Sequence, residues 1–119
     1  MGVVVVGLSS LDTVASTAGD AAGDALVAEA ARRLRSCCGT HETLGRLGGG
    51  RFGVLSETGE RQAVLRLAGS IVAALEEPVA LAGVGEVRAS PAVGVAIGEG
   101  GDRDLDAVEP APFLEPRRN

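Results

Sequence analysis

The sequence predicts an α/β (α+β) fold in which two long helices pack on a mainly antiparallel sheet of about five strands. Three observations support this class: an apolar, β-branched run at residues 3–8, two long segments with helical periodicity, and a three-glycine turn between two short apolar segments. A continuous run of this kind is typical of a strand buried on both faces. Apolar residues every three or four positions are typical of a helix that covers a core.

The N-terminal half begins with the predicted central strand, residues 3–8. Residues 12–20 are small and polar and predict at best a short helix. From Asp24 the apolar residues follow a helical period, so a long helix is predicted there, with Asp24 as its N-cap and Gly39 as its stop. Two short strands follow, at residues 43–47 and 51–55. Gly48, Gly49 and Gly50 join them in a predicted hairpin, because glycine adopts the backbone conformations of tight turns without steric cost.

The C-terminal half adds a second long helix at residues 60–76, which Pro78 ends. A strand pair at 79–82 and 86–97 is predicted after it, with Pro91 at a sheet edge, a bulge or a strand start. This order is that of a ferredoxin-like, palm-type arrangement. We assign residues 1–108 to one domain and residues 109–119, which hold the last three prolines and follow close on an acidic run, to an irregular tail.

Composition excludes several classes of function. The formal net charge is −5 and the chain has only two aromatic residues, both phenylalanine, so neither a basic face nor a stacking platform for nucleic acid is expected. The apolar N-terminal run is too short to span a membrane, so no membrane partner is expected either. The only cysteines, Cys37 and Cys38, are adjacent, which favours a reducing compartment over a disulfide framework. The expected location is the cytoplasm.

Three segments carry a resemblance to a known family. The hairpin Arg46–Leu55, which reads Arg-Leu-Gly-Gly-Gly-Arg-Phe-Gly-Val-Leu, resembles the signature hairpin of GGDEF domains, the diguanylate cyclase family. The segment Gly19–Val27 is similar to the family's Gly-His-x-x-Gly-Asp-x-Leu-Leu motif, and Val93–Ala96 resembles its Ser-Ile-Gly-Val-Ala strand. The resemblance covers about residues 3–106, with the signature replaced by Gly-Gly-Gly-Arg-Phe.

The resemblance implies a family that condenses two GTP molecules across a homodimer with Mg²⁺ held by carboxylates. The positions that it assigns to those carboxylates are Gly7 and Ser9 at the first strand, and Gly50 and Arg51 in the signature. None of these side chains is a metal ligand, and Arg51 would repel a cation. We therefore expect no catalytic residue, no metal site, no cofactor and no enzymatic activity.

The nucleotide contacts that the resemblance implies are mostly replaced as well. The position of a phosphate-binding lysine holds Asp12, and that of a guanine-binding asparagine holds Ala15. Asp24 keeps the family's guanine-binding aspartate, although an aspartate at a helix start is at least as well explained as the N-cap. The product-inhibition segment aligns with Gly39–Glu42 and lacks its arginine. Arg51, beside three glycines, could contact an anion or could simply be a solvated hairpin residue.

These observations predict a degenerate, catalytically inactive GGDEF-like domain. Its expected role is that of a regulatory or protein-interaction module in bacterial nucleotide second-messenger signalling, as a dimer or against another signalling protein. The alternative is a non-catalytic sensor of a guanine nucleotide, GTP or cyclic di-GMP, in which Asp24 contacts the base and Arg51 an anionic group.

Overall fold

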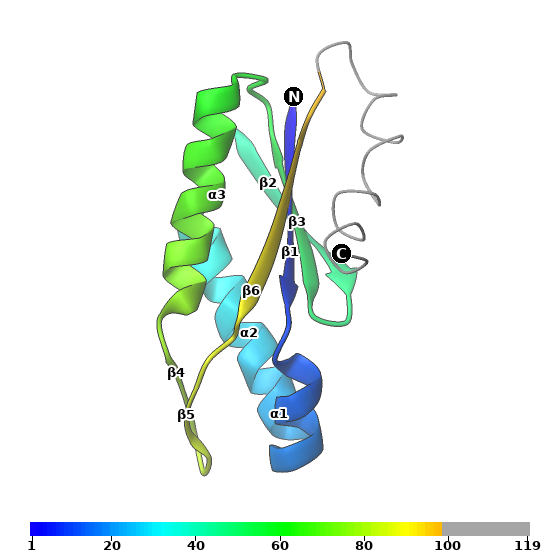
Figure 1. Ribbon diagram of the computed structural model, residues 1–119, viewed down its shortest axis with the longest axis vertical. Helices are drawn as coiled ribbons and strands as arrows, with labels where there is room; N and C mark the ends of the chain where they lie inside the picture. Colours follow the sequence, from blue (N-terminus) through cyan, green and yellow to red (C-terminus); the bar gives the residue numbers. More distant parts are fainter. Residues whose placement is uncertain (99–119) are drawn as a thin grey trace.

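A four-stranded antiparallel sheet with helices on one face makes up residues 1–98, the part of the chain that the computed structural model describes (Figure 1). The predicted α/β class is confirmed. The elements are β1 (Gly2–Leu8), α1 (Leu11–Ala18), α2 (Asp20–Cys37), β2 (Glu42–Gly48), β3 (Arg51–Ser56), α3 (Arg61–Glu76), β4 (Val79–Leu81), β5 (Gly85–Val87) and β6 (Pro91–Ile97). The tail at 109–119 and the acidic run before it lie outside the described residues.

Strand β1 is the centre of the sheet, as its sequence predicts. The strand order is β2-β3-β1-β6, and all seven residues of β1 are buried. Its even-numbered residues Val4, Val6 and Leu8 belong to the core beneath α2 and α3, together with Phe52 and Val54 of β3. The helices on one face therefore account for the burial of the even-numbered residues of this apolar run, and a strand pairs with β1 on each side.

Helices α2 and α3 bury apolar stripes against this sheet and against each other. The buried residues include Leu26, Ala30 and Leu34 of α2, and the stripe of α3 consists of Val64, Ala68, Ile71 and Leu75. Their spacing of three and four residues places each stripe on one helix face. The predicted helix at 60–76 is therefore confirmed to within one residue.

Arg33 fastens the middle of α2 to the end of α3. Its guanidinium donates hydrogen bonds to the carbonyl oxygens of Ala74 (3.0 Å), Glu77 (2.7 Å) and Pro78 (2.9 Å). Glu29, one turn earlier on α2, accepts a hydrogen bond of 2.8 Å from Nε of the same guanidinium. The last carbonyls of a helix have no partners within the helix, so this contact supplies them and fixes the α2–α3 geometry.

The start of α2 differs from the prediction. The helix begins at Asp20, not Asp24, and Gly19, with φ of 99°, separates it from α1. Asp24 lies in the second turn, so its assignment as an N-cap is wrong. Sequence reasoning placed the start too late because Gly23 disfavours a helix in isolation. Here α1 packs against that turn: a Cβ at position 23 would lie 3.2 Å from Cβ of Ala15.

The predicted strand at 86–97 is also interrupted. Strands β4 and β5 form a separate two-stranded sheet, and β6 begins only at Pro91, where it joins β1 at the edge of the main sheet. Ser90, with φ of 54°, turns the chain between β5 and β6. Within the described residues the main sheet therefore has four strands instead of about five. The expected place of Pro91, at a strand start and a sheet edge, is confirmed.

The predicted hairpin is confirmed as β2 and β3. Gly48 and Gly49 have φ of 100° and 56°, conformations that favour glycine, so the turn needs two of the three glycines for this reason. The register between the strands shifts between Arg46 and Gly48. No helix within residues 1–98 is long and apolar enough to cross a membrane.

Candidate functional site

The hairpin turn meets the end of β1 in what we call the signature corner, formed by Gly7, Leu11, Gly50 and Arg51. Gly7 of β1 is the register partner of Arg51 of β3. The backbone N–H of Leu8 donates a hydrogen bond of 2.9 Å to the carbonyl oxygen of Gly50. The structure thus brings together three of the four positions singled out in the sequence. The fourth position, Ser9, has a different partner: its backbone N–H donates a hydrogen bond of 3.0 Å to the carbonyl oxygen of Ser90.

Leu11, the first residue of α1, fills the space beside the turn. A Cβ added at Gly50 would lie 2.7 Å from Cδ2 of Leu11, closer than such atoms approach in proteins. The other methyl, Cδ1, would lie 3.5 Å from a Cβ at Gly23 on α2. Leu11 is partly buried and packs against the core. The side chain of Leu11 therefore occupies the place where a side chain at position 50 would begin.

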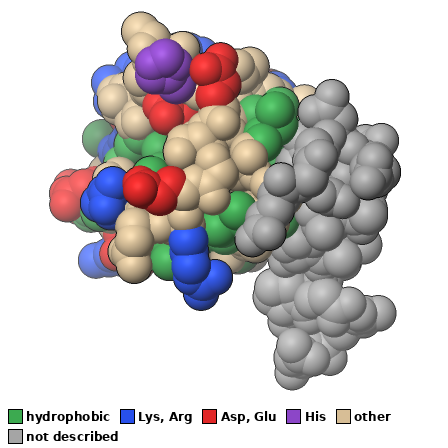
Figure 2. Space-filling model, turned by 90° about the horizontal axis from the view of Figure 1, so that it is seen from above, with side chains coloured by type: hydrophobic (Ala, Val, Ile, Leu, Met, Phe, Trp, Pro, Cys, Tyr) green, Lys and Arg blue, Asp and Glu red, His purple; other side chains and the backbone are tan. Residues whose placement is uncertain are grey.

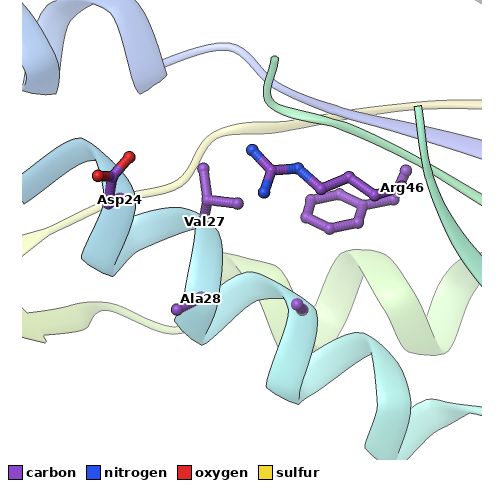
Figure 3. A pocket seen from close by; sticks show the side chains of 6 residues that line it. Asp24, Val27, Ala28 and Arg46 are labelled. Carbon is purple, nitrogen blue, oxygen red and sulfur yellow. The ribbon is translucent and has the colours of Figure 1, made fainter. Parts of the chain in front are cut away.

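A second feature is a pocket of about 180 Å³ between α2 and the hairpin. We call it the α2 pocket; its lining residues are Asp24, Val27, Ala28, Ala31, Arg46 and Phe52. Figure 3 shows the side chain of Arg46 reaching from β2 across the pocket toward Val27, with the carboxylate of Asp24 at the far end. The arrangement offers a hydrogen-bond acceptor at one end, a guanidinium at the other and apolar walls between them.

Arg46, which sequence reasoning did not single out as a binding residue, shares this pocket with Asp24, and Arg51 does not. Arg46 is the register partner of Phe52, whose buried side chain faces the helices. Side chains alternate along a strand, so Arg51 points to the opposite face of the sheet from Phe52. The two residues predicted to bind one nucleotide thus lie on different faces. The signal that could have found Arg46 is its place opposite Phe52 in the predicted hairpin.

The segment Gly39–Glu42, where the resemblance places product inhibition, is closed by its own contacts. The carboxylate of Glu42 accepts a hydrogen bond from the backbone N–H of Gly39. Nδ1 of His41 lies 3.2 Å from Oε1 of Glu57, and both side chains are about three-quarters exposed, at 76% and 73%. On the face in Figure 2 the histidine lies beside acidic side chains, with basic side chains scattered elsewhere on that face.

Both cysteines are free thiols and both are partly buried against the core. Sγ of Cys37 lies 3.8 Å from the carbonyl oxygen of Ser70 on α3. Burial raises the pKa of both thiols above its ordinary value. The pair is therefore not arranged as a reactive thiolate. Within residues 1–98 no three histidine, cysteine or acidic side chains are grouped so that they could hold a metal ion.

Comparison with protein families identifies the chain. The sequence model described as diguanylate cyclase, GGDEF domain, matches residues 1–110, which is more than nine-tenths of the chain. This chain belongs to the GGDEF family. The resemblance of the hairpin and of the two other segments is thereby confirmed as a family relationship.

Solved GGDEF structures share the fold. The GGDEF domain of the Pseudomonas aeruginosa protein YfiN has a TM-score of 0.86 and 24% identity, over 99% of this chain and 76% of that one. A sensory box/GGDEF family protein from Caulobacter crescentus has a TM-score of 0.84 and 30% identity, over 98% and 76%. The diguanylate cyclase SiaD of P. aeruginosa, solved with its activator SiaC, has a TM-score of 0.82 and 22% identity, over 98% and 46%.

A curated relative shares a shorter segment. An uncharacterised 19.3 kDa protein of Streptomyces ambofaciens, encoded in the region 5′ of repSA, is 50% identical over 50 residues. The matched segment spans 42% of this chain and 27% of that protein, so the relative is much longer than the part that corresponds.

The family assignment corrects one expectation. We predicted from the replaced metal positions that the chain is not an enzyme. This prediction is wrong as drawn, because the family that matches residues 1–110 is one of diguanylate cyclases. The residues at positions 7, 9, 50 and 51 do not set the chain outside its enzyme family.

Proposed function

We propose that this GGDEF domain serves as a regulatory or protein-interaction module in cyclic di-GMP signalling in the cytoplasm. The observation that carries the proposal is the signature corner, where Leu11 packs into the space beside Gly50. The apolar framework of the family is retained around a corner that is used for packing. A domain that keeps this framework is suited to binding by proteins that contact the framework and not the corner.

The test is the effect of the purified chain on the active GGDEF diguanylate cyclases of its own organism. Added in stoichiometric amounts, it is expected to change the rate of cyclic di-GMP formation by one of them at least twofold, and to sediment with it. The Phe52→Ala variant, expected to unfold, is the matched control. Unchanged rates and separate sedimentation with every cyclase would contradict the proposal. A reaction with the chain and GTP alone measures its own cyclic di-GMP formation separately.

The second candidate function, binding of a guanine nucleotide, is favoured by the corrected position of Asp24. Because the residue does not cap α2, its carboxylate is available to the α2 pocket, where it could accept hydrogen bonds from the N–H groups of a guanine edge. Pockets for drug-sized ligands hold about 300–1,000 Å³. At about 180 Å³, the α2 pocket is smaller, so the base would enter it and the phosphates would lie outside.

Calorimetric titration with GTP and with cyclic di-GMP, each with Mg²⁺, tests this second function. We expect Asp24→Ala to weaken guanine-nucleotide binding at least tenfold, and Asp20→Ala, one turn earlier on α2, to leave it unchanged. Arg46→Ala should weaken it more than Arg51→Ala does, because only Arg46 lines the pocket. The absence of heat with both nucleotides, or equal binding of ATP, would contradict guanine recognition.

A further inference from the structure

Strand β2 is an open edge of the main sheet. It is the terminal strand in the order β2-β3-β1-β6, and within residues 1–98 no strand pairs with its outer side (Figure 1). Five of its seven residues are exposed. Proteins protect such edges with proline, charged side chains, bulges or a covering segment, since an open edge is a template for pairing. β2 contains no proline, its register stays regular from Glu42 to Arg46 before the shift that follows, and its two charged residues, Glu42 and Arg46, have opposite signs.

The backbone groups of β2 divide cleanly between its two sides. The N–H of Glu57 donates a hydrogen bond of 3.0 Å to the carbonyl oxygen of His41, which fixes these two residues as a hydrogen-bonded pair. In an antiparallel ladder the bonded pairs recur every second residue, so Thr43 and Gly45 also bond toward β3. The N–H and C=O groups of Leu44 and Arg46 and the C=O group of Glu42 therefore point outward, while the N–H of Glu42 donates a hydrogen bond of 3.3 Å to the carbonyl oxygen of Gly39.

The outward residues are complementary to a second copy of themselves. If two β2 strands pair antiparallel about a two-fold axis at Leu44, each Glu42 lies opposite Arg46 of the other copy, and Leu44 lies opposite Leu44. The two Leu44 residues then exchange two hydrogen bonds, and the N–H of each Arg46 donates to the C=O of Glu42 in the other copy. Opposite charges directly across a strand pair are stabilising. The Glu42–Arg46 pair occurs twice, because the interface is isologous.

We infer that β2 binds β2 of a second copy of this chain, so that the two main sheets join into one continuous sheet. The inference rests on the proposed function only in that the chain acts through protein contacts, and it names one such contact. Within one chain the guanidinium of Arg46 donates a hydrogen bond of 3.1 Å to the carbonyl oxygen of Gly49, and the carboxylate of Glu42 accepts one from the N–H of Gly39. Both contacts are exposed, and in the paired state the two side chains would exchange them for ion pairs across the two strands.

Charge reversal tests the pairing by sedimentation equilibrium. The unaltered chain is expected to dimerise. Glu42→Arg and Arg46→Glu should each weaken the dimer at least about tenfold, because each places like charges opposite one another at both ends of the pair. The double variant Glu42→Arg/Arg46→Glu should restore it. An equimolar mixture of the two single variants should form a heterodimer, since one then carries only arginine and the other only glutamate at these positions.

Two further variants separate pairing from folding. Leu44→Pro removes an N–H that points away from β3, so it should abolish the dimer and preserve the circular dichroism of the fold. Glu86→Arg makes the same charge change as Glu42→Arg at an exposed position of β5 and should leave the dimer unaffected. A monomer at all concentrations, or a dimer indifferent to these reversals, would overturn the inference and leave the proposed function standing. A chain that dimerises through β2 but changes the rate of no cyclase would support the inference and contradict the proposed function.

Discussion

The helix-covered face of the sheet and the signature corner are held together in different ways. On the helix-covered face, each buried side chain has several buried neighbours, and Arg33 adds hydrogen bonds between α2 and α3. In the signature corner, one side chain, Leu11, packs against a turn of glycines. The comparison teaches that the framework can persist while the corner changes, because no core residue depends on a side chain at Gly7 or Gly50.

The largest effect is expected where the two regions share a residue. Phe52 lies two residues after the last glycine of the turn, is 1% exposed, and lines the α2 pocket. Phe52→Ala should cost about 3–5 kcal/mol of the free energy of unfolding, enough to unfold a domain of ordinary stability. Phe52→Leu should cost about 1–1.5 kcal/mol. Urea denaturation measures both; equal small losses would show that the hairpin is not tied to the core.

Removal of the Arg33 contacts tests the framework away from the corner. Arg33→Met keeps an apolar stem but removes the donors to three carbonyl groups, so a loss of about 2 kcal/mol is expected. Arg33→Lys should recover only part of this loss, because an ammonium group cannot reproduce the planar fork of a guanidinium. Thermal unfolding measures the difference. Complete recovery by lysine would mean that charge alone, and not the fork, holds the two helices.

A smaller effect is expected in the corner itself. Gly50→Ala should destabilise the fold by about 1 kcal/mol, because its Cβ would meet Leu11. In the Leu11→Ala background the same substitution should cost much less, since the obstructing methyl groups are gone. The double-mutant cycle measured in urea gives this coupling energy directly. Additive losses would show that Leu11 does not determine what position 50 can hold.

The same contact limits any attempt to rebuild a metal site. Carboxylates introduced by Gly7→Asp, Gly50→Asp and Arg51→Glu should give little Mg²⁺ affinity while Leu11 is present. Addition of Leu11→Ala to the triple variant should increase that affinity, as measured by calorimetric titration with MgCl₂. Equal Mg²⁺ binding with and without Leu11 would show that the leucine moves aside at little cost.

The sequence predicted what depends on local periodicity. Strand β1, helix α3 and the hairpin follow from apolar patterns and glycines that are close together along the chain. The start of α2 could not be predicted in this way, because it depends on the packing of Ala15 against Gly23. The break at Ser90 also escaped prediction, since β5 and β6 join different sheets.

The candidate site was less predictable for the same reason. The resemblance placed Gly7, Gly50 and Arg51 together, and the register confirms their proximity. The contact between Leu11 and Gly50 joins residues far apart in the sequence. The pairing of Asp24 with Arg46 in one pocket requires the strand register and the position of α2, neither of which a motif specifies.

The smallest effect concerns the dependence of the framework on pH. Hydrogen bonds from Arg32 and then Arg33 lower the pKa of Glu29 from 4.5 to about 2. Because the pKa is lower in the folded state, the ionised carboxylate stabilises the fold above about pH 4.5, and this contribution is lost as the pH falls toward 2. The side chain of Arg32 is 65% exposed, so the contribution should be below about 1 kcal/mol.

Glu29→Gln, with Glu86→Gln as the exposed control, isolates this contribution. At pH 7 the urea midpoint of Glu29→Gln should lie below that of the unaltered chain, and the two should converge near pH 2, where Glu29 becomes protonated. Glu86→Gln should follow the unaltered chain throughout. A constant difference between pH 7 and pH 2 would assign the role of Glu29 to its hydrogen-bond geometry with Arg33 and not to its charge, and the framework would then be as insensitive to acid as the corner, whose packing against Leu11 involves no titrating group.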